Sequence, residues 1–209
     1  MTHYRKRTIA FAVCLSFLAG YVDAFGFLSM GGFFVSFMSG NSTRLGVGLG
    51  TGHFLQAAKA FGLICVFVLG VALASLAGKR VGNKRRQAIL ALVTAALTLA
   101  SVTAISRAPL TPPLLALAMG MLNGVFERDG EVTIGLTYMT GALVKMGQRL
   151  AGAVSGGSKT EWLPFAALWL GLALGASCGA GFFASYGVSL IWVSAVYAAL
   201  MTAISPRVP

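Results

Sequence analysis

The sequence predicts an all-α membrane protein, a polytopic bundle of transmembrane helices. Hydrophobic residues make up 57% of the chain and charged residues only 10%, whereas a soluble domain carries roughly 25% charged residues. So few charges cannot cover a water-soluble surface, and such a hydrophobic chain is not disordered. The net charge is +11, and the Lys and Arg residues that produce it lie mainly in short runs beside apolar stretches. This placement is typical of membrane proteins, and we expect no nucleic-acid partner.

Six apolar stretches approach the roughly 20 residues that a helix needs to cross a bilayer. In order, they are about 7–29, 55–78, 88–106, 110–127, 162–184 and 187–205. The first stretch follows the basic run 5–7 and is not followed by a small-residue cleavage site, so we interpret it as an uncleaved transmembrane helix. Pro112 and Pro113 fall in the first turn of the fourth stretch, where proline is tolerated.

Two further segments, 31–50 and 130–150, are partly apolar but are interrupted by glycine and small polar residues. If each enters and leaves the membrane on one side, the basic runs 5–7 and 79–87 share a side, as the positive-inside rule requires. If both segments crossed the membrane, these runs would lie on opposite sides. We therefore favour six spanning helices plus two re-entrant or broken helices, with cytoplasmic N- and C-termini. Full crossing by both segments is the alternative.

The two halves of the chain match each other at an offset of about 100 residues. Gly20-Tyr21-Val22-Asp23 aligns with Gly120-Met121-Leu122-Asn123. Ser36-Phe37-Met38-Ser39-Gly40 aligns with Thr137-Tyr138-Met139-Thr140-Gly141. The matching order of these motifs indicates an internal duplication.

Three spanning helices per half is an odd number, so the second half must enter the membrane from the opposite side. We therefore expect a single transmembrane domain, 1–209, made of two inverted-topology repeats, about 7–107 and 108–207. This architecture is typical of secondary transporters and some channels. Their binding sites lie near the midplane, where discontinuous helices meet.

The two interrupted segments contain the residues that could form such a site. In both, a hydroxyl residue and a glycine break the chain, and a basic residue follows four positions after the glycine. We expect Ser39 and Thr140 to be N-caps of two half-helices, whose free amides and positive dipole ends would together attract an anion. The candidate substrate-binding residues are Ser39, Gly40, Asn41, Arg44, Thr140, Gly141 and Lys145. Alternatively, both segments are surface turns whose basic side chains extend to lipid head groups.

Asp23 is the one acidic residue among the first 126 and lies inside the first spanning helix. Because an unpaired carboxylate is costly there, we expect it to face the bundle interior and to be protonated or to pair with a cation. Arg44 is the nearest candidate partner in the sequence. We assign Asp23 and its repeat equivalent, Asn123, a coupling or gating role. The alternative for Asp23 is a structural anchor that hydrogen-bonds to the re-entrant backbone.

Motifs for catalysis or metal binding are not found in the sequence. The three cysteines are embedded in apolar runs without a C-x-x-C spacing, and His3 and His53 are far apart. Nucleotide-binding, zinc-protease and hydrolase motifs are also missing. The acidic cluster 127–131 is interpreted as an interfacial turn. We therefore expect no enzymatic activity, no cofactor and no metal.

Glycines recur at every fourth position in the fifth apolar stretch, at Gly171, Gly175 and Gly179. Small residues at this spacing allow two helices to approach closely. The partner helix could belong to the same chain or to a second copy, so a homodimer is left open.

Two motifs, Gly20-Tyr21-Val22-Asp23 and Met38-Ser39-Gly40-Asn41, resemble the YoaK-like family of bacterial multi-pass membrane proteins, a domain of unknown function. The resemblance extends over essentially the whole chain. It implies about six helices and a location in the bacterial inner membrane, and it implies no activity. Ala142 stands in the second half where the first has Asn41, so any site is asymmetric in detail.

Together these observations favour an integral membrane transporter or channel for a small anionic solute, with its site between the two half-helices at the repeat interface. A non-catalytic membrane scaffold or assembly protein is the alternative. A lipid- or quinone-modifying enzyme is less favoured, because Asp23 is the one deep carboxylate. The partners expected are the lipid bilayer and the solute.

Overall fold

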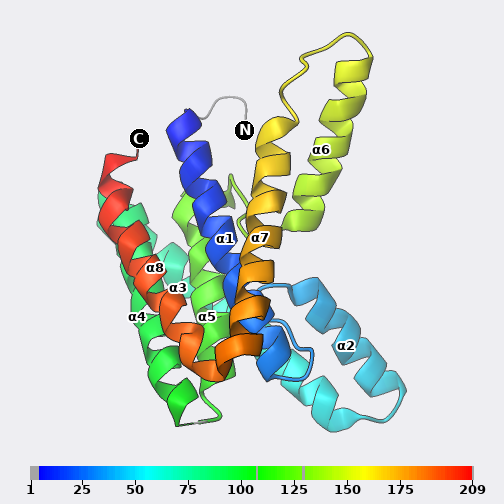
Figure 1. The fold of residues 1–209 in the computed structure, drawn as a ribbon, viewed down its shortest axis with the longest axis vertical. Coiled ribbons are helices and arrows are strands. Elements are labelled where there is room, and N and C mark those ends of the chain that lie inside the picture. Colours follow the sequence, from blue (N-terminus) through cyan, green and yellow to red (C-terminus); the bar gives the residue numbers. More distant parts are fainter. Residues whose placement is uncertain (1–4, 107, 129, 209) are drawn as a thin grey trace.

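The protein is a bundle of helices (Figure 1). The computed structural model describes residues 5–106, 108–128 and 130–208. His3 and Asp129, which entered the expectations above, lie outside the described residues. The α-helices are α1 (Lys6–Ser29), α2 (Met38–Gly50), α3 (Phe54–Val81), α4 (Arg85–Ile105), α5 (Thr111–Asn123), α6 (Met139–Val154), α7 (Leu163–Tyr186) and α8 (Ile191–Ile204). Two short strands, β1 (Glu127–Arg128) and β2 (Glu131–Val132), form an antiparallel hairpin.

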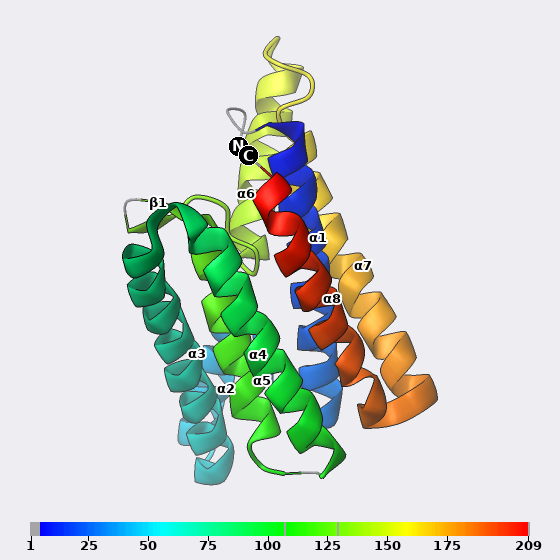
Figure 2. The ribbon, with the colours of Figure 1, turned by 90° about the vertical axis from the view of Figure 1, so that its left-hand side faces the viewer.

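Among the described residues, three helical stretches are long and apolar enough to cross a membrane: Lys6–Ser29, Phe54–Ile105 and Leu163–Arg207. The second stretch contains α3 and α4, and the third contains α7 and α8; in each, the chain reverses at a short 3-10 turn (Figures 1 and 2). A shorter apolar helix, Thr111–Phe126, comprises α5 and the turn that follows it. These features confirm the all-α membrane helix bundle.

The two interrupted segments each contain a short helix. α2 and α6 begin near the middle of the molecule and run toward opposite ends of it (Figure 1). Both begin at a methionine, Met38 and Met139, with Phe37 and Tyr138 at the N-cap positions and no capping side chain. The expectation that Ser39 and Thr140 are N-caps is therefore wrong. The N-cap of each helix lies two residues earlier than expected, at an aromatic residue that ends the preceding loop.

Glycines set the closest helix contacts. α1 packs along α7, and α3 packs along α5. A side chain at Gly175 would collide with the Phe17 carbonyl of α1, and one at Gly70 would collide with the Leu117 carbonyl of α5. The small-residue spacing in α7 thus serves a contact within the chain.

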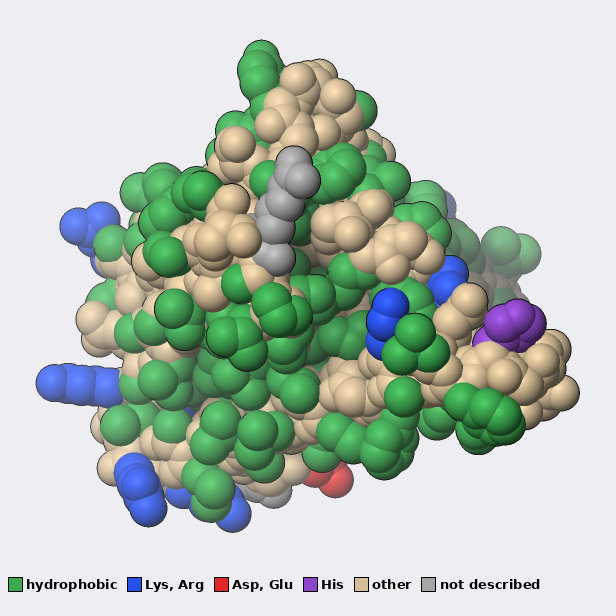
Figure 3. All heavy atoms as spheres, turned by 90° about the horizontal axis from the view of Figure 1, so that it is seen from below, with side chains coloured by type: hydrophobic (Ala, Val, Ile, Leu, Met, Phe, Trp, Pro, Cys, Tyr) green, Lys and Arg blue, Asp and Glu red, His purple; other side chains and the backbone are tan. Residues whose placement is uncertain are grey.

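Large apolar side chains cover much of the outer surface, as expected for a bundle that lipid surrounds. Figure 3 views the molecule from the end opposite the chain termini, and hydrophobic side chains spread across that view. Half or more of the Val68, Leu99 and Leu174 side chains is exposed, although each lies within an apolar helix. A water-soluble protein would bury such side chains.

Candidate functional site: two interrupted helices meeting on α1

Asp23 of α1 holds the loop that precedes α2. Its Oδ1 accepts hydrogen bonds from the backbone N–H groups of Val35 and Ser36, both at 2.8 Å. Val35 is fully buried and Ser36 nearly so, and a buried amide without a partner is costly. The carboxylate therefore takes the place of the carbonyls that a continuous helix would have supplied. This geometry is that of an anchor to the loop backbone.

The expected pairing of Asp23 with Arg44 is not formed within the described part of the chain. Arg44 lies on α2, and its guanidinium stands 4.9 Å from the centre of the Phe33 ring. It also packs against Gly32, whose positive φ of 94° is a backbone conformation that favours glycine. Arg44 thus lies over the loop as a cation on an aromatic face.

Asn41 fastens the same loop from the α2 side. Its Oδ1 accepts from the Phe34 N–H at 3.1 Å, and its Nδ2 donates to the Phe34 carbonyl at 2.7 Å. The side chain is fully buried, so these bonds are shielded from competition. Asn41, which was predicted to bind substrate, therefore joins the loop to the first turn of α2.

The loop before α6 is held from two helices. On α5, Asn123 Oδ1 accepts from the Thr137 hydroxyl at 3.2 Å, and its Nδ2 donates to the Met119 carbonyl at 3.1 Å. On α1, the Ser16 hydroxyl donates to the Leu136 carbonyl at 3.3 Å. Asn123 and Asp23 thus play similar parts, each binding the loop that follows its own helix.

One face of α1 binds both loops. Ser16 and Asp23 are seven residues apart, which is two helical turns and about 10 Å along the axis. Seven residues return a helix to nearly the same face. The loops before α2 and α6 are therefore held on the same face of α1, two turns apart, and the half-helices lead away from them in opposite directions (Figure 1).

The predicted site residues differ in exposure and surroundings. Gly141 and Lys145 line one pocket of about 120 Å³, together with Tyr138, Ala142 and residues of α7. No described residue of the first interrupted segment lines this pocket. Ser39 and Thr140 are exposed at the starts of their helices, and Gly40 is half-buried. The structure therefore groups the predicted residues by segment and attaches the loops of both segments to α1.

Ser16 and Thr137 make hydrogen bonds at the loop before α6 that the sequence analysis did not single out. Ser16 is a hydroxyl in an otherwise apolar stretch, two turns before Asp23 on the same helical face. The seven-residue spacing between Ser16 and Asp23 was the signal in the sequence that could have identified Ser16. Among the described residues, no group of three or more His, Cys, Asp or Glu side chains is placed to hold a metal ion.

Comparison with known proteins gives the family. Residues 11–204 match the family described as "Protein of unknown function (DUF1275)". The chain belongs to this DUF1275 family. It is 37% identical over 201 residues to the UPF0700 transmembrane protein RA0705 of Rhizobium meliloti (strain 1021), covering 96% of this chain and 87% of that protein.

A second relative agrees with the resemblance found in the motifs. The chain is 27% identical over 158 residues to the UPF0700 transmembrane protein YoaK of Bacillus subtilis (strain 168), covering 70% of this chain and 68% of that protein. No solved structure matches the chain. The YoaK-like resemblance is confirmed, and the relatives support a location in a lipid bilayer.

Proposed function

We propose that the protein is a transporter or channel for a small anion, with its path at the starts of α2 and α6. The observation that carries the proposal is that two half-helices begin from loops held on the same face of α1. The first turn of a helix has amide N–H groups without helical partners and a partial positive charge. Two such ends facing the middle of a membrane favour a negatively charged solute.

Two inverted repeats are part of this proposal, and the helix contacts support them. α1 packs on α7 as α5 packs on α3, and α2 packs on α3 as α6 packs on α7. The polar contacts follow the same rule, since Asp23 and Asn123 each bind the loop after their own helix. Exchanging the halves preserves these helix pairs, as expected for two-fold related repeats.

We infer six spanning helices, α1, α3, α4, α5, α7 and α8, in a bacterial inner membrane. Both termini lie at one end of the molecule, as does the turn between α3 and α4 (Figures 1 and 2). The basic runs 5–7 and 79–86 belong to that end. The positive-inside rule places this end in the cytoplasm. No catalytic step is part of the proposal, and it does not require a second copy of the chain.

Arg44 and Lys145 supply positive charge six residues, nearly two turns, beyond the two helix starts. Asp23 and Asn123 act in gating. An open path requires the loops to move, and that movement must break the hydrogen bonds of Asp23 or Asn123. Arg44 would exchange its contact with the buried Phe33 ring, a cation–π interaction worth about 1–2 kcal/mol, for contact with the solute.

Anion flux into proteoliposomes tests the proposal. Vesicles containing the full chain are assayed with chloride, nitrate and phosphate, beside protein-free vesicles. We expect flux of at least one anion, reduced about tenfold in Arg44→Gln and in Lys145→Gln, since a hydrogen bond to a charged group is worth on the order of 1.5–3 kcal/mol. Lys59→Gln and Lys159→Gln remove equal charge outside both segments and serve as controls. Unchanged flux in both site variants would refute the site.

A scaffold or assembly role is the second candidate, because one observation favours it. Asp23 and Asn41 are both satisfied by the loop backbone, so the interior polar groups of the first segment already have partners within the chain. A scaffold requires such a closed interior and carries no solute. An absence of flux for every anion in the panel, from folded and correctly inserted protein, would favour this candidate.

A further inference from the structure

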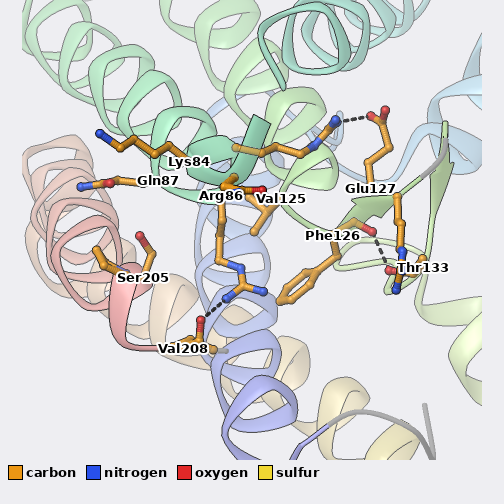
Figure 4. A pocket seen from close by; sticks show the side chains of 13 residues that line it. Lys84, Arg86, Gln87, Val125, Phe126, Glu127, Thr133, Ser205 and Val208 are labelled. Atoms are coloured by element: carbon orange, nitrogen blue, oxygen red, sulfur yellow. Dashed lines mark hydrogen bonds and ion pairs between the residues drawn. The ribbon is translucent and has the colours of Figure 1, made fainter. Parts of the chain in front are cut away.

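A pocket lined by basic side chains lies at the end of the molecule that carries both termini. Its volume is about 590 Å³, and it is bounded by the start of α4, the hairpin after α5 and the turn that follows α8 (Figure 4). Lys84, Arg85, Arg86 and Arg128 line it, and Glu127 is the one acidic side chain among the described residues of its wall. Charge and concavity together distinguish this place from an ordinary basic surface.

Arg85 is fixed within the wall of this pocket. Its Nε donates to the Gly124 carbonyl at 3.1 Å, and its Nη2 lies 2.6 Å from Glu127 Oε2. Glu127 also accepts a hydrogen bond from the Ser75 hydroxyl at 3.0 Å. The ion pair therefore joins α3, α4 and the hairpin, and it holds the shape of the pocket before any ligand arrives. Such preorganisation reduces the entropy lost on binding.

Arg86 is oriented by different partners. Its Nη1 donates to the Val208 carbonyl at 2.7 Å, as the dashed line in Figure 4 marks. Its guanidinium stands 5.8 Å and 5.4 Å from the ring centres of Phe11 and Phe126. A planar guanidinium held in this way is suited to the oxygen atoms of a phosphate, which it can bind in a two-pronged fashion.

Two more features add to the positive potential. The first three residues of α4 line the pocket, so the amide end of a 21-residue helix borders it. A second pocket of about 440 Å³ shares Pro206 with the first and is lined by Arg5, Lys6, Arg7 and Arg207. The basic region therefore continues around the turn that follows α8.

We propose that the pocket at the start of α4 is a phosphate site for the head group of an anionic phospholipid. The pocket lies where apolar helices end, which is the level of the head groups, and basic pockets between transmembrane helices bind such groups. Inorganic phosphate presents the same oxygen chemistry and is the other source to be tested. This site is separate from the half-helices, and its test uses no transport measurement.

Lipid binding to the purified full-length protein in detergent tests the inference. Native mass spectrometry follows titrations with phosphatidylglycerol, with zwitterionic phosphatidylethanolamine and with inorganic phosphate. We expect saturable binding of phosphatidylglycerol that is about tenfold weaker in Lys84→Gln/Arg128→Gln, because each basic residue near an anionic head group contributes a few-fold. Both side chains are exposed, so their loss leaves the packed interior intact.

A matched double variant distinguishes lipid binding in the pocket from general electrostatic attraction between the lipid and the basic end of the protein. Lys79→Gln/Arg80→Gln removes the same charge from the last turn of α3, outside the pocket, and we expect its binding to change less than twofold. Equal weakening in the two double variants, or equal binding of the two lipids, would overturn the inference. Saturable binding of inorganic phosphate without binding of phosphatidylglycerol would overturn the lipid as the source while supporting a phosphate site.

Discussion

Ser16 and Asp23 lie seven residues apart on α1, and each binds the backbone of a different interrupted segment. Ser16 donates to the Leu136 carbonyl of the second segment, and Asp23 accepts from two amides of the first. One helix of the first half therefore holds both loops. A displacement of α1 would move the starts of α2 and α6 together, which is how a change at one loop could reach the other.

Replacement of Asp23 tests its role as an acceptor. Asp23→Ala leaves the amides of Val35 and Ser36 buried without a partner, and we expect a loss of about 3 kcal/mol of stability. Asp23→Asn keeps an oxygen in place, as Asn123 does in the second half, and should retain most of the stability. Thermal unfolding in detergent measures both variants. Equal destabilisation by Asn and Ala would contradict an anchor that acts through its acceptor oxygen.

Asn41 makes two complementary bonds to Phe34, so both its oxygen and its nitrogen should be needed. We expect Asn41→Asp to lose the donor and Asn41→Ala to lose both bonds, each lowering stability by about 2 kcal/mol. Ser42→Ala is the matched control, since the exposed Ser42 hydroxyl binds only the Met38 carbonyl within the same helix. The same unfolding assay applies, and a control as unstable as the Asn41 variants would show that α2 tolerates no change.

The contact of α1 with α7 depends on glycine. In Gly175→Ala the added methyl would meet the Phe17 carbonyl, so the helices must separate. We expect lower yield of folded protein and a clear drop in melting temperature. Gly181→Ala, on the same helix, meets no atom within 4 Å, and it should be neutral or stabilising by about 0.5–1 kcal/mol. Similar behaviour of the two variants would contradict the close packing.

The helices could be predicted from the sequence because lipid imposes length and hydrophobicity on them. The fifth stretch was expected at about 162–184 and α7 occupies Leu163–Tyr186. The second was expected at 55–78, whereas α3 continues to Val81, because Lys79 and Arg80 are stable in a last turn that reaches the head groups. Hydropathy thus locates a helix but does not fix the turn that leaves the bilayer.

The interior of the interrupted segments could not be predicted in the same way. Pairing Asp23 with Arg44 followed from their charges, but the loop folds back so that the amides of Val35 and Ser36 reach the carboxylate first. A backbone anchor was the alternative given for Asp23, and the sequence held no signal that favoured it over pairing with Arg44. The hairpin at Glu127–Val132 was also not identified as strands, because two residues per strand give no periodicity.

We also predict on which side of the membrane α2 ends, and the prediction follows from the length of α2. α2 has 13 residues, which is about 20 Å of helix, short of the roughly 30 Å hydrocarbon core. α1 crosses the membrane before it, so a half-length α2 leaves the turn at Thr51 on the side opposite the N-terminus. A fully crossing α2 would return Thr51 to the side of the N-terminus.

Labelling of single-cysteine variants shows directly on which side of the membrane Thr51 lies. In a chain whose three cysteines are replaced by alanine, Thr51→Cys and Ser158→Cys are treated with a membrane-impermeant maleimide on intact cells. We expect Thr51→Cys to be labelled at once and Ser158→Cys only after the membrane is opened, because Ser158 lies in the connection between α6 and α7 at the end that carries the termini (Figure 1). Asn83→Cys, between α3 and α4, should behave as Ser158→Cys does. Protection of Thr51→Cys in intact cells would mean that α2 crosses the bilayer, and the two half-helices would then no longer face each other within it.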